Sequence, residues 1–88
     1  AGFKCQLCDA IGKDPYVFKK SNGEYYIETH HVIQVSELVE GSLSSRNLLD
    51  VCPNHHRQLH YGNVEIIENN DNSVTFNIDN KEIKVDKL

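Results

Sequence analysis

The most informative residues of this 88-residue chain lie in one short sequence, Cys52-Pro-Asn-His55-His56-Arg-Gln-Leu-His60. Proline suits the first position of a helix, because its missing N–H needs no partner there, and Gly62 suits the stop. The stretch therefore predicts a helix of roughly two and a half turns. On this helix His56 and His60 share one face, whereas the adjacent His55 and His56 point about 100° apart. The two neighbouring histidines therefore belong to two different sites.

The first predicted site is a structural zinc site. Cys52 and His55 repeat the two-residue gap that separates Cys5 from Cys8. A set of three cysteines and one histidine closes tetrahedrally on zinc. The alternatives are that Cys52 is a buried core residue and that Cys5 and Cys8 carry out redox chemistry. A zinc ion would tie the N-terminal turn to the start of the helix and supply folding free energy to a chain that is short for an independent core.

The second predicted site uses His56 and His60 with a third ligand. The chain offers His30 or His31 for this position, or a carboxylate. Three protein ligands with an open position are typical of a catalytic ion, because water or substrate must also bind. The alternative, an ordinary exposed helix face, loses weight because His30 and His31 form a second tight pair. Imidazole ligands favour Zn, Ni, Co or Mn over Mg.

The remaining chain predicts strands. Residues 16–28 have the pattern of a hairpin around Asn22-Gly23. Strands are predicted from His30 to Val35 and over residues 47–51, with a loop over 36–46. After Gly62, the stretches 64–67, 73–78 and 81–85, which are separated by turn residues, predict two or three short strands. The expected fold class is α+β.

Composition limits the class of protein. Three cysteines cannot all pair as disulfides, and no apolar run is long enough to span a membrane, so we expect no membrane association and a reducing, cytoplasmic setting. The formal charge of −4 is the wrong sign for a free-standing nucleic-acid binder. The first residue is alanine rather than methionine, which suggests a processed chain or a fragment of a longer protein.

These motifs together resemble the HNH (ββα-metal) endonucleases of the zinc-knuckle type. The matching segments run from Cys5 to Tyr61 and are the two knuckles, Glu28-Thr-His-His-Val32, Asn47-Leu-Leu49 and the His-x-x-x-His of the helix. His55 stands where that family has a fourth cysteine, and Gln34-Val35 stands where it has a proline. The resemblance implies that His30, His56 and His60 hold the catalytic ion, that His31 is the general base, and that Asn47 orients its ring.

The resemblance also implies a function. We expect a DNA endonuclease with one catalytic ion (Mg, Mn, Ni, Co or Zn) beside the structural zinc. It would be the cleavage module of a restriction-type or phage-borne enzyme, attached to a separate DNA-recognition domain. The expected architecture is a ββα-metal core over residues 1–63 and a C-terminal antiparallel β extension over 64–88, in one domain overall. Exposed edges of that extension could pair with a second copy.

Several polar residues have two interpretations. Arg57, Lys19 and Lys20 could contact DNA phosphates or could simply be solvated. Glu28 could pair with a basic residue, could hydrogen-bond to a side chain that binds a metal ion, or could be a surface strand residue. A competing function for the whole chain is a non-catalytic zinc module that binds nucleic acid or a protein partner.

Overall fold

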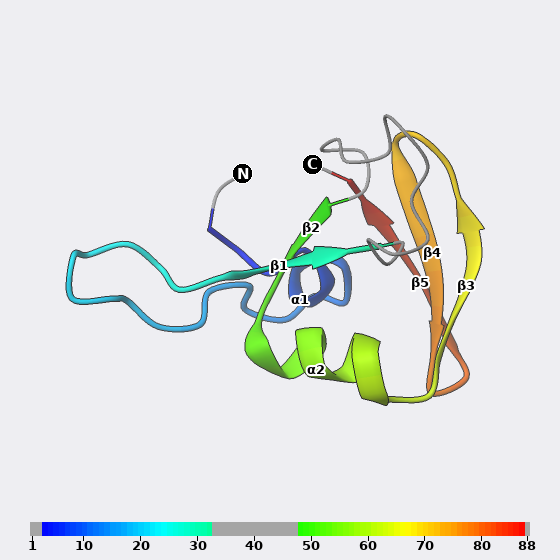
Figure 1. Ribbon diagram of the computed structural model, residues 1–88, viewed down its shortest axis with the longest axis horizontal. Helices are drawn as coiled ribbons and strands as arrows, with labels where there is room; N and C mark the ends of the chain where they lie inside the picture. The colour runs from blue at the N-terminus through cyan, green and yellow to red at the C-terminus, as the bar shows by residue number, and fades with distance from the viewer. Residues whose placement is uncertain (1–2, 33–47, 88) are drawn as a thin grey trace.

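A computed structural model describes residues 3–32 and 48–87 of the chain (Figure 1). Its elements, in chain order, are α1 (Gln6–Ala10), β1 (Glu28–His31), β2 (Leu48–Val51), α2 (Pro53–Tyr61), β3 (Val64–Asn69), β4 (Ser73–Ile78) and β5 (Lys81–Asp86). The chain is thus a small α+β protein. The predicted loop over 36–46, the end of the first predicted strand and Asn47 lie outside the described residues.

The strands β1 and β2 and the helix α2 form one continuous unit. β1 and β2 pair antiparallel with Thr29 opposite Asp50 and His30 opposite Leu49. The chain leaves β2 directly into α2, where Cys52 is the N-cap and Pro53 the first helical residue, as the sequence predicts. The helix ends at Gly62, whose backbone is extended; a Cβ there would lie 2.7 Å from the carbonyl oxygen of Gln58, so the position requires glycine.

A second sheet has the strand order β3-β4-β5. All pairs are antiparallel, and β3 carries a bulge between Ile66 and Glu68. Asp79 and Asn80 both have positive φ, as the tight two-residue turn between β4 and β5 requires. Of the two or three strands predicted after Gly62, three are present.

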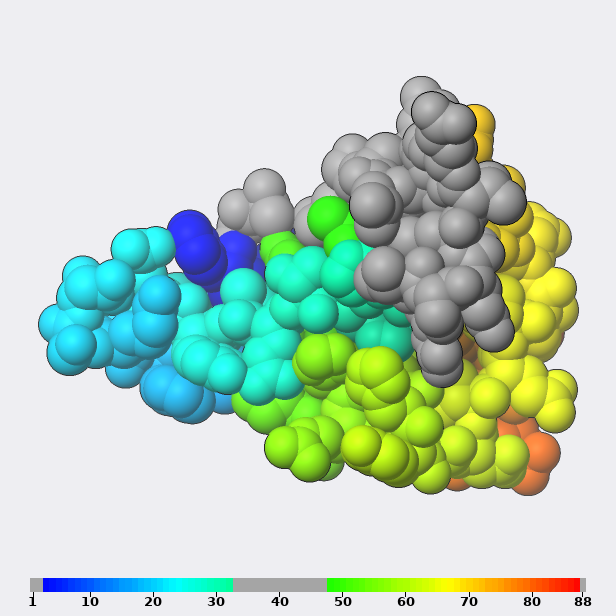
Figure 2. All heavy atoms as spheres, viewed as in Figure 1, coloured from blue at the N-terminus to red at the C-terminus, as the bar shows by residue number. Residues whose placement is uncertain are grey.

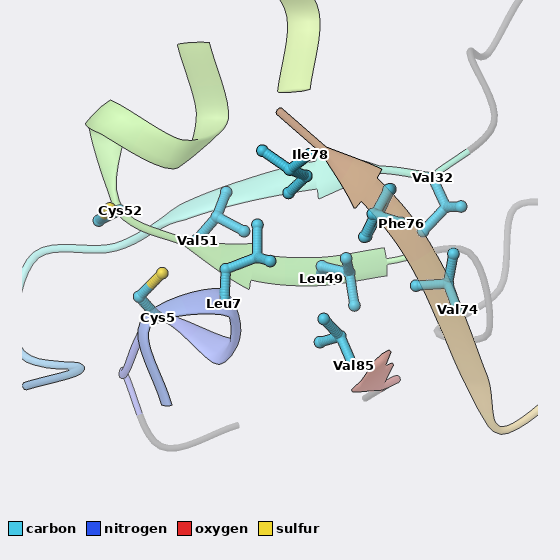
Figure 3. Close-up of a cluster of buried hydrophobic side chains, with 10 residues drawn as sticks. All are labelled: Cys5, Leu7, Val32, Leu49, Val51, Cys52, Val74, Phe76, Ile78 and Val85. Atoms are coloured by element: carbon cyan, nitrogen blue, oxygen red, sulfur yellow. The ribbon is translucent and has the colours of Figure 1, made fainter. Parts of the chain in front are cut away.

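The hydrophobic core lies between the two sheets and α1 (Figure 3). Leu49 and Val51 of β2 meet Phe76 and Val74 of β4, and each of these side chains is nearly or fully buried. Leu7 of α1 closes the same cluster. One hydrophobic core thus contains residues from before and after position 63. The division into a core over residues 1–63 and a β extension over 64–88 stays a prediction.

Residues 13–27 form a protruding hairpin that we call the arm (Figures 1 and 2). It turns at Asn22-Gly23, with Gly23 at a φ of 86°, and Lys19 pairs with Tyr25 across it. The amide of Tyr26 donates to the carbonyl of Phe18. The predicted Asn-Gly hairpin is therefore present, and its second limb runs on into β1.

Within the described residues, neither helix is long and apolar enough to cross a membrane.

Candidate metal centres

The first cluster of possible metal ligands joins the N-terminal ends of α1 and α2. Cys5 caps α1 and accepts from the amide of Cys8, while Cys52 caps α2 and accepts from the amide of His55. The same local geometry therefore presents two ligands from each helix start. The sequence predicts only a tight turn at Cys5 to Cys8. The five-residue helix α1 forms there because the cap and the contacts of Leu7 with the core hold it.

The distances within this first cluster fit one tetrahedral ion. The Nδ1 atom of His55 lies 3.5, 3.4 and 3.4 Å from the sulfurs of Cys5, Cys8 and Cys52. The sulfurs of Cys8 and Cys52 are 3.9 Å apart. Zinc bonds of about 2.3 Å to sulfur and 2.1 Å to nitrogen give tetrahedral edges of about 3.6–3.8 Å. The four side chains could therefore hold a metal such as zinc, and none of the three cysteines is in a disulfide.

The acid–base properties of these thiols also favour a cation. Burial opposes ionisation of Cys5, yet hydrogen bonds from His55 and from backbone amides lower its pKa to about 6. Burial and the neighbouring Cys5 raise the pKa of Cys8 to about 12. Ionisation of Cys5 is thus favoured, and the negative charge of its thiolate opposes ionisation of Cys8. A divalent cation removes that opposition, because it binds thiolates directly.

The second cluster is made by three histidines from two elements. His30 on β1 and His56 and His60 on α2 offer ligand atoms that all lie within 4.8 Å of one another. The Nε2 atoms of His56 and His60 are 3.3 Å apart, close to the separation of two nitrogens on one ion. We call these three residues the histidine triad. Although His30 lies in a strand and the other two in a helix, the antiparallel pairing of β1 with β2 brings them together.

Glu28 and Tyr26 fix the ring of His56. Nδ1 of His56 donates to Oε1 of Glu28 at 2.7 Å, and the hydroxyl of Tyr26 donates to Oε2 at 2.7 Å. These two hydrogen bonds lower the pKa of the Glu28 carboxyl, so it is ionised and accepts both. With its Nδ1 proton engaged, His56 presents the lone pair of Nε2 to the triad. Tyr26 is a contact that the sequence analysis missed, and its signal was the two-residue spacing from Glu28 on an extended segment.

His30 is the most buried member of the triad. It is only 6% exposed, and its Nδ1 atom has no hydrogen-bond partner among the described residues. Burial and the nearby His60 and His56 lower its pKa to about 4, so the ring is neutral at pH 7. A neutral, buried imidazole beside two others is suited to a cation, because only the neutral form donates a lone pair.

His31 lies next to the triad without belonging to it. It is not among the residues whose ligand atoms converge, as expected because adjacent strand positions face opposite sides. It nevertheless lines, together with His30 and His60, a cavity of about 290 Å³ between β1, α2 and the second sheet. Asn47, its predicted partner, lies outside the described residues.

The other predicted contact residues lie on the surface. Arg57 is exposed on α2, one position after His56, and its charge contributes to lowering the pKa of Glu28. Lys19 and Lys20 are exposed on the arm, beyond Tyr26 as seen from the triad. The structure thus brings the two predicted ligand sets together and leaves these three cations outside both.

Over most of its length, this chain is similar to a known protein, the type IV methyl-directed restriction enzyme EcoKMcrA of Escherichia coli strain K12. The two are 39% identical over 64 residues, which are 70% of this chain and 22% of the restriction enzyme. This chain therefore spans about a fifth of its relative. No family model matches the sequence, and no solved structure matches the fold.

Proposed function

We propose that this chain is the cleavage module of a metal-dependent DNA endonuclease of the HNH (ββα-metal) type. The observation that carries the proposal is the histidine triad, whose three imidazole nitrogens lie within 4.8 Å of one another. Its residues come from β1 and α2 of the consecutive elements β1, β2 and α2. Similarity to a restriction enzyme supports the same function. Under this proposal residues 1–63 are the nuclease core and residues 64–88 a β extension packed on it.

The triad leaves room for substrate. His30, His56 and His60 supply three ligands, so positions on a tetrahedral or octahedral ion stay open for a phosphate oxygen. These three residues would hold the ion, which when bound would supply Lewis-acid stabilisation of the charge that develops in phosphodiester hydrolysis. The hydrogen bond from Glu28 to Nδ1 of His56 would leave the Nε2 lone pair of His56 facing the ion site between the three histidines. Neutral nitrogen ligands favour Zn, Ni, Co or Mn over Mg.

His31 is our candidate for the general base. It lines the same cavity as His30 and His60, and an imidazole can take a proton from an attacking water near neutral pH. Asn47 would orient its ring. Arg57, which is exposed on α2, would contact a phosphate. Lys19 and Lys20 would neutralise phosphates farther along the DNA.

The cluster of Cys5, Cys8, Cys52 and His55 is proposed to hold a structural zinc ion. It links the caps of α1 and α2, and so fixes the start of the helix that carries His56. Because the chain spans a fifth of its relative, we propose that DNA recognition resides in a separate domain. Pairing of two copies through the edges of the β3-β4-β5 sheet is a further expectation.

A plasmid-nicking assay tests the proposal. Zinc-loaded protein is incubated with supercoiled plasmid and Mg, Mn, Ni, Co or Zn in turn. We expect nicking with at least one ion, and loss of nicking in His60→Ala and His31→Ala with circular dichroism unchanged. Absence of cleavage with every ion would instead support the non-catalytic zinc module, and normal cleavage by His31→Ala would remove its role as base.

A further inference from the structure

The arm presents an ordered set of exposed aromatic rings. The rings of Tyr16 and Tyr25 lie with their centroids 4.4 Å apart and their planes tilted by 34°. Phe18 stacks on Tyr26 at 5.0 Å with the ring planes 10° apart. Tyr16 and Phe18 are 44% and 53% exposed. Pairs across a hairpin hold each other's rotamers, so these rings form a rigid surface that points away from the core. Folding of the body gains little from them, because they lie outside its hydrophobic cluster.

The arm is also basic within an acidic chain. Its three lysines outnumber its two acids, whereas the whole chain has a formal charge of −4. Both acids serve the arm itself: Asp14 accepts from the amide of Tyr16, and Glu24 accepts from the side chain of Asn22. Within residues 3–32 and 48–87, no carboxylate lies at ion-pairing distance from Lys19 or Lys20. Lys19 instead lies 5.4 Å from the ring centre of Tyr25.

The arm is continuous with the histidine triad. Tyr26 at its base donates to Glu28, which in turn holds His56. The second limb of the arm enters β1, where His30 lies four residues beyond Tyr26. From His30 to Glu24, where the turn begins, is six residues of chain; fully extended it would span up to about 20 Å, which is the length of about six phosphates along one DNA strand. Figure 2 shows the outer part of the arm projecting from the body.

We propose that the arm is a DNA-holding element that lies along the duplex on one side of the scissile phosphate. The rings of Tyr16 and Phe18 contact the nucleotides, and Lys19 and Lys20 contact phosphates. A two-stranded ribbon is an element that the major groove admits. The exposed Lys19 and Lys20, which have no ion-pair partner among the described residues, and the continuity with the triad favour DNA over a protein partner. This inference rests on the proposed nuclease function, because it places the scissile phosphate at the triad.

Binding of DNA without cleavage tests the arm directly. The zinc-loaded 88-residue chain, with no other divalent ion, is titrated against a fluorescent duplex of about 20 base pairs, long enough for the expected contacts. Anisotropy is read at several salt concentrations. Three variants are compared: Phe18→Ala, the double variant Lys19→Ala with Lys20→Ala, and a control with Lys81→Ala and Lys84→Ala, which removes two exposed lysines of β5. Circular dichroism verifies that each one folds.

The two arm variants should differ in their salt dependence. Loss of two phosphate contacts should reduce the slope of log affinity against log salt by about 2. Loss of the Phe18 ring should weaken binding on the order of tenfold and leave the slope unchanged. The control should behave as the unaltered chain does. If both arm variants bind DNA with unaltered affinity and slope, the inference is overturned, and the aromatic surface would be left for a protein partner.

A separate measurement isolates the proposed function. Hydrolysis of bis(p-nitrophenyl) phosphate by the unaltered chain requires the triad and no contact with the arm, because the molecule is a single diester. Arm-dependent DNA binding without hydrolysis of this diester or of plasmid would count against the nuclease and support the arm. Hydrolysis together with arm-independent binding would support the nuclease and refute the arm.

Discussion

Replacing Glu28 by alanine should weaken divalent-ion binding at the histidine triad without unfolding the chain. Oε1 of Glu28 is 2.7 Å from Nδ1 of His56, and this hydrogen bond selects the tautomer whose Nε2 can bind an ion. In the Ala variant the ring loses both its orientation and the negative charge that strengthens it as a ligand. Glu28→Gln is a milder change, because the amide oxygen can still accept the Nδ1 proton.

The size of the effect follows from the environment of this hydrogen bond. Removal of a partner behind a metal ligand typically lowers affinity by about 10- to 100-fold, or about 1.4–2.7 kcal/mol. The side chains of Glu28 and His56 are 25% and 24% exposed, so solvent screens the pair only in part. We therefore expect a loss near the upper limit, about 100-fold, for Glu28→Ala and near the lower limit, about tenfold, for Glu28→Gln.

Calorimetric titration of Ni or Co ions into the zinc-loaded protein measures this affinity. The matched control is Glu65→Gln, which removes an exposed carboxylate from β3. Zinc content is determined before and after titration, so that changes at the cysteine cluster are separated from changes at the triad. Equal affinity of Glu28→Ala and the unaltered protein would refute the role that we assign to this carboxylate.

Three further predictions concern stability. Cys5→Ser should lose zinc and unfold or loosen the domain in circular dichroism, because a structural zinc ion contributes about 10–16 kcal/mol, as much as a typical domain's whole stability; a folded, zinc-replete variant would contradict this. Phe76→Ala should lower the free energy of unfolding in urea by about 3–5 kcal/mol, whereas Ile67→Ala, at a site 52% exposed, should change it by less than about 0.5 kcal/mol. In the metal-free triad the pKa of His30 falls from 6.5 to about 4. As pH falls, His30 is therefore protonated in the unfolded chain before it is protonated in the folded one, and the free energy of unfolding should fall by up to about 3 kcal/mol between pH 6.5 and pH 4. Urea titrations at each pH should show a smaller fall for His30→Gln.

Local signals made the helix α2 and the C-terminal sheet predictable. Pro53 and Gly62 mark the two ends of α2 by the chemistry of single residues, and the structure agrees at both. The Asp79-Asn80 turn is of the same kind, since two positive φ values need residues that tolerate them. The spacing of His55, His56 and His60 also separated the two ligand sets, because helix geometry fixes which side chains share a face.

Contacts between distant segments were not predictable. Nothing in the spacing of Cys5 and Cys8 indicates that α1 forms, because its five residues depend on packing by Leu7 and on a cap. The hydrogen bond from the side chain of Gln6 to β5 joins residues eighty positions apart, and no local pattern encodes it. The roles of His31 and Asn47 stay predictions, since strand alternation alone directs His31 away from the ligand atoms of His30.

The adjacency of His55 and His56 limits how this sequence can change over time. One residue belongs to the cysteine cluster and its neighbour to the histidine triad, at the first turn of one helix. An insertion or deletion between Cys52 and His60 would rotate every later side chain by about 100° and carry at least one ligand out of its set. Single substitutions at Asn54 or Gln58 leave the phase of the helix intact. In a randomised library of this segment, survivors should therefore vary in residue type while keeping its length constant.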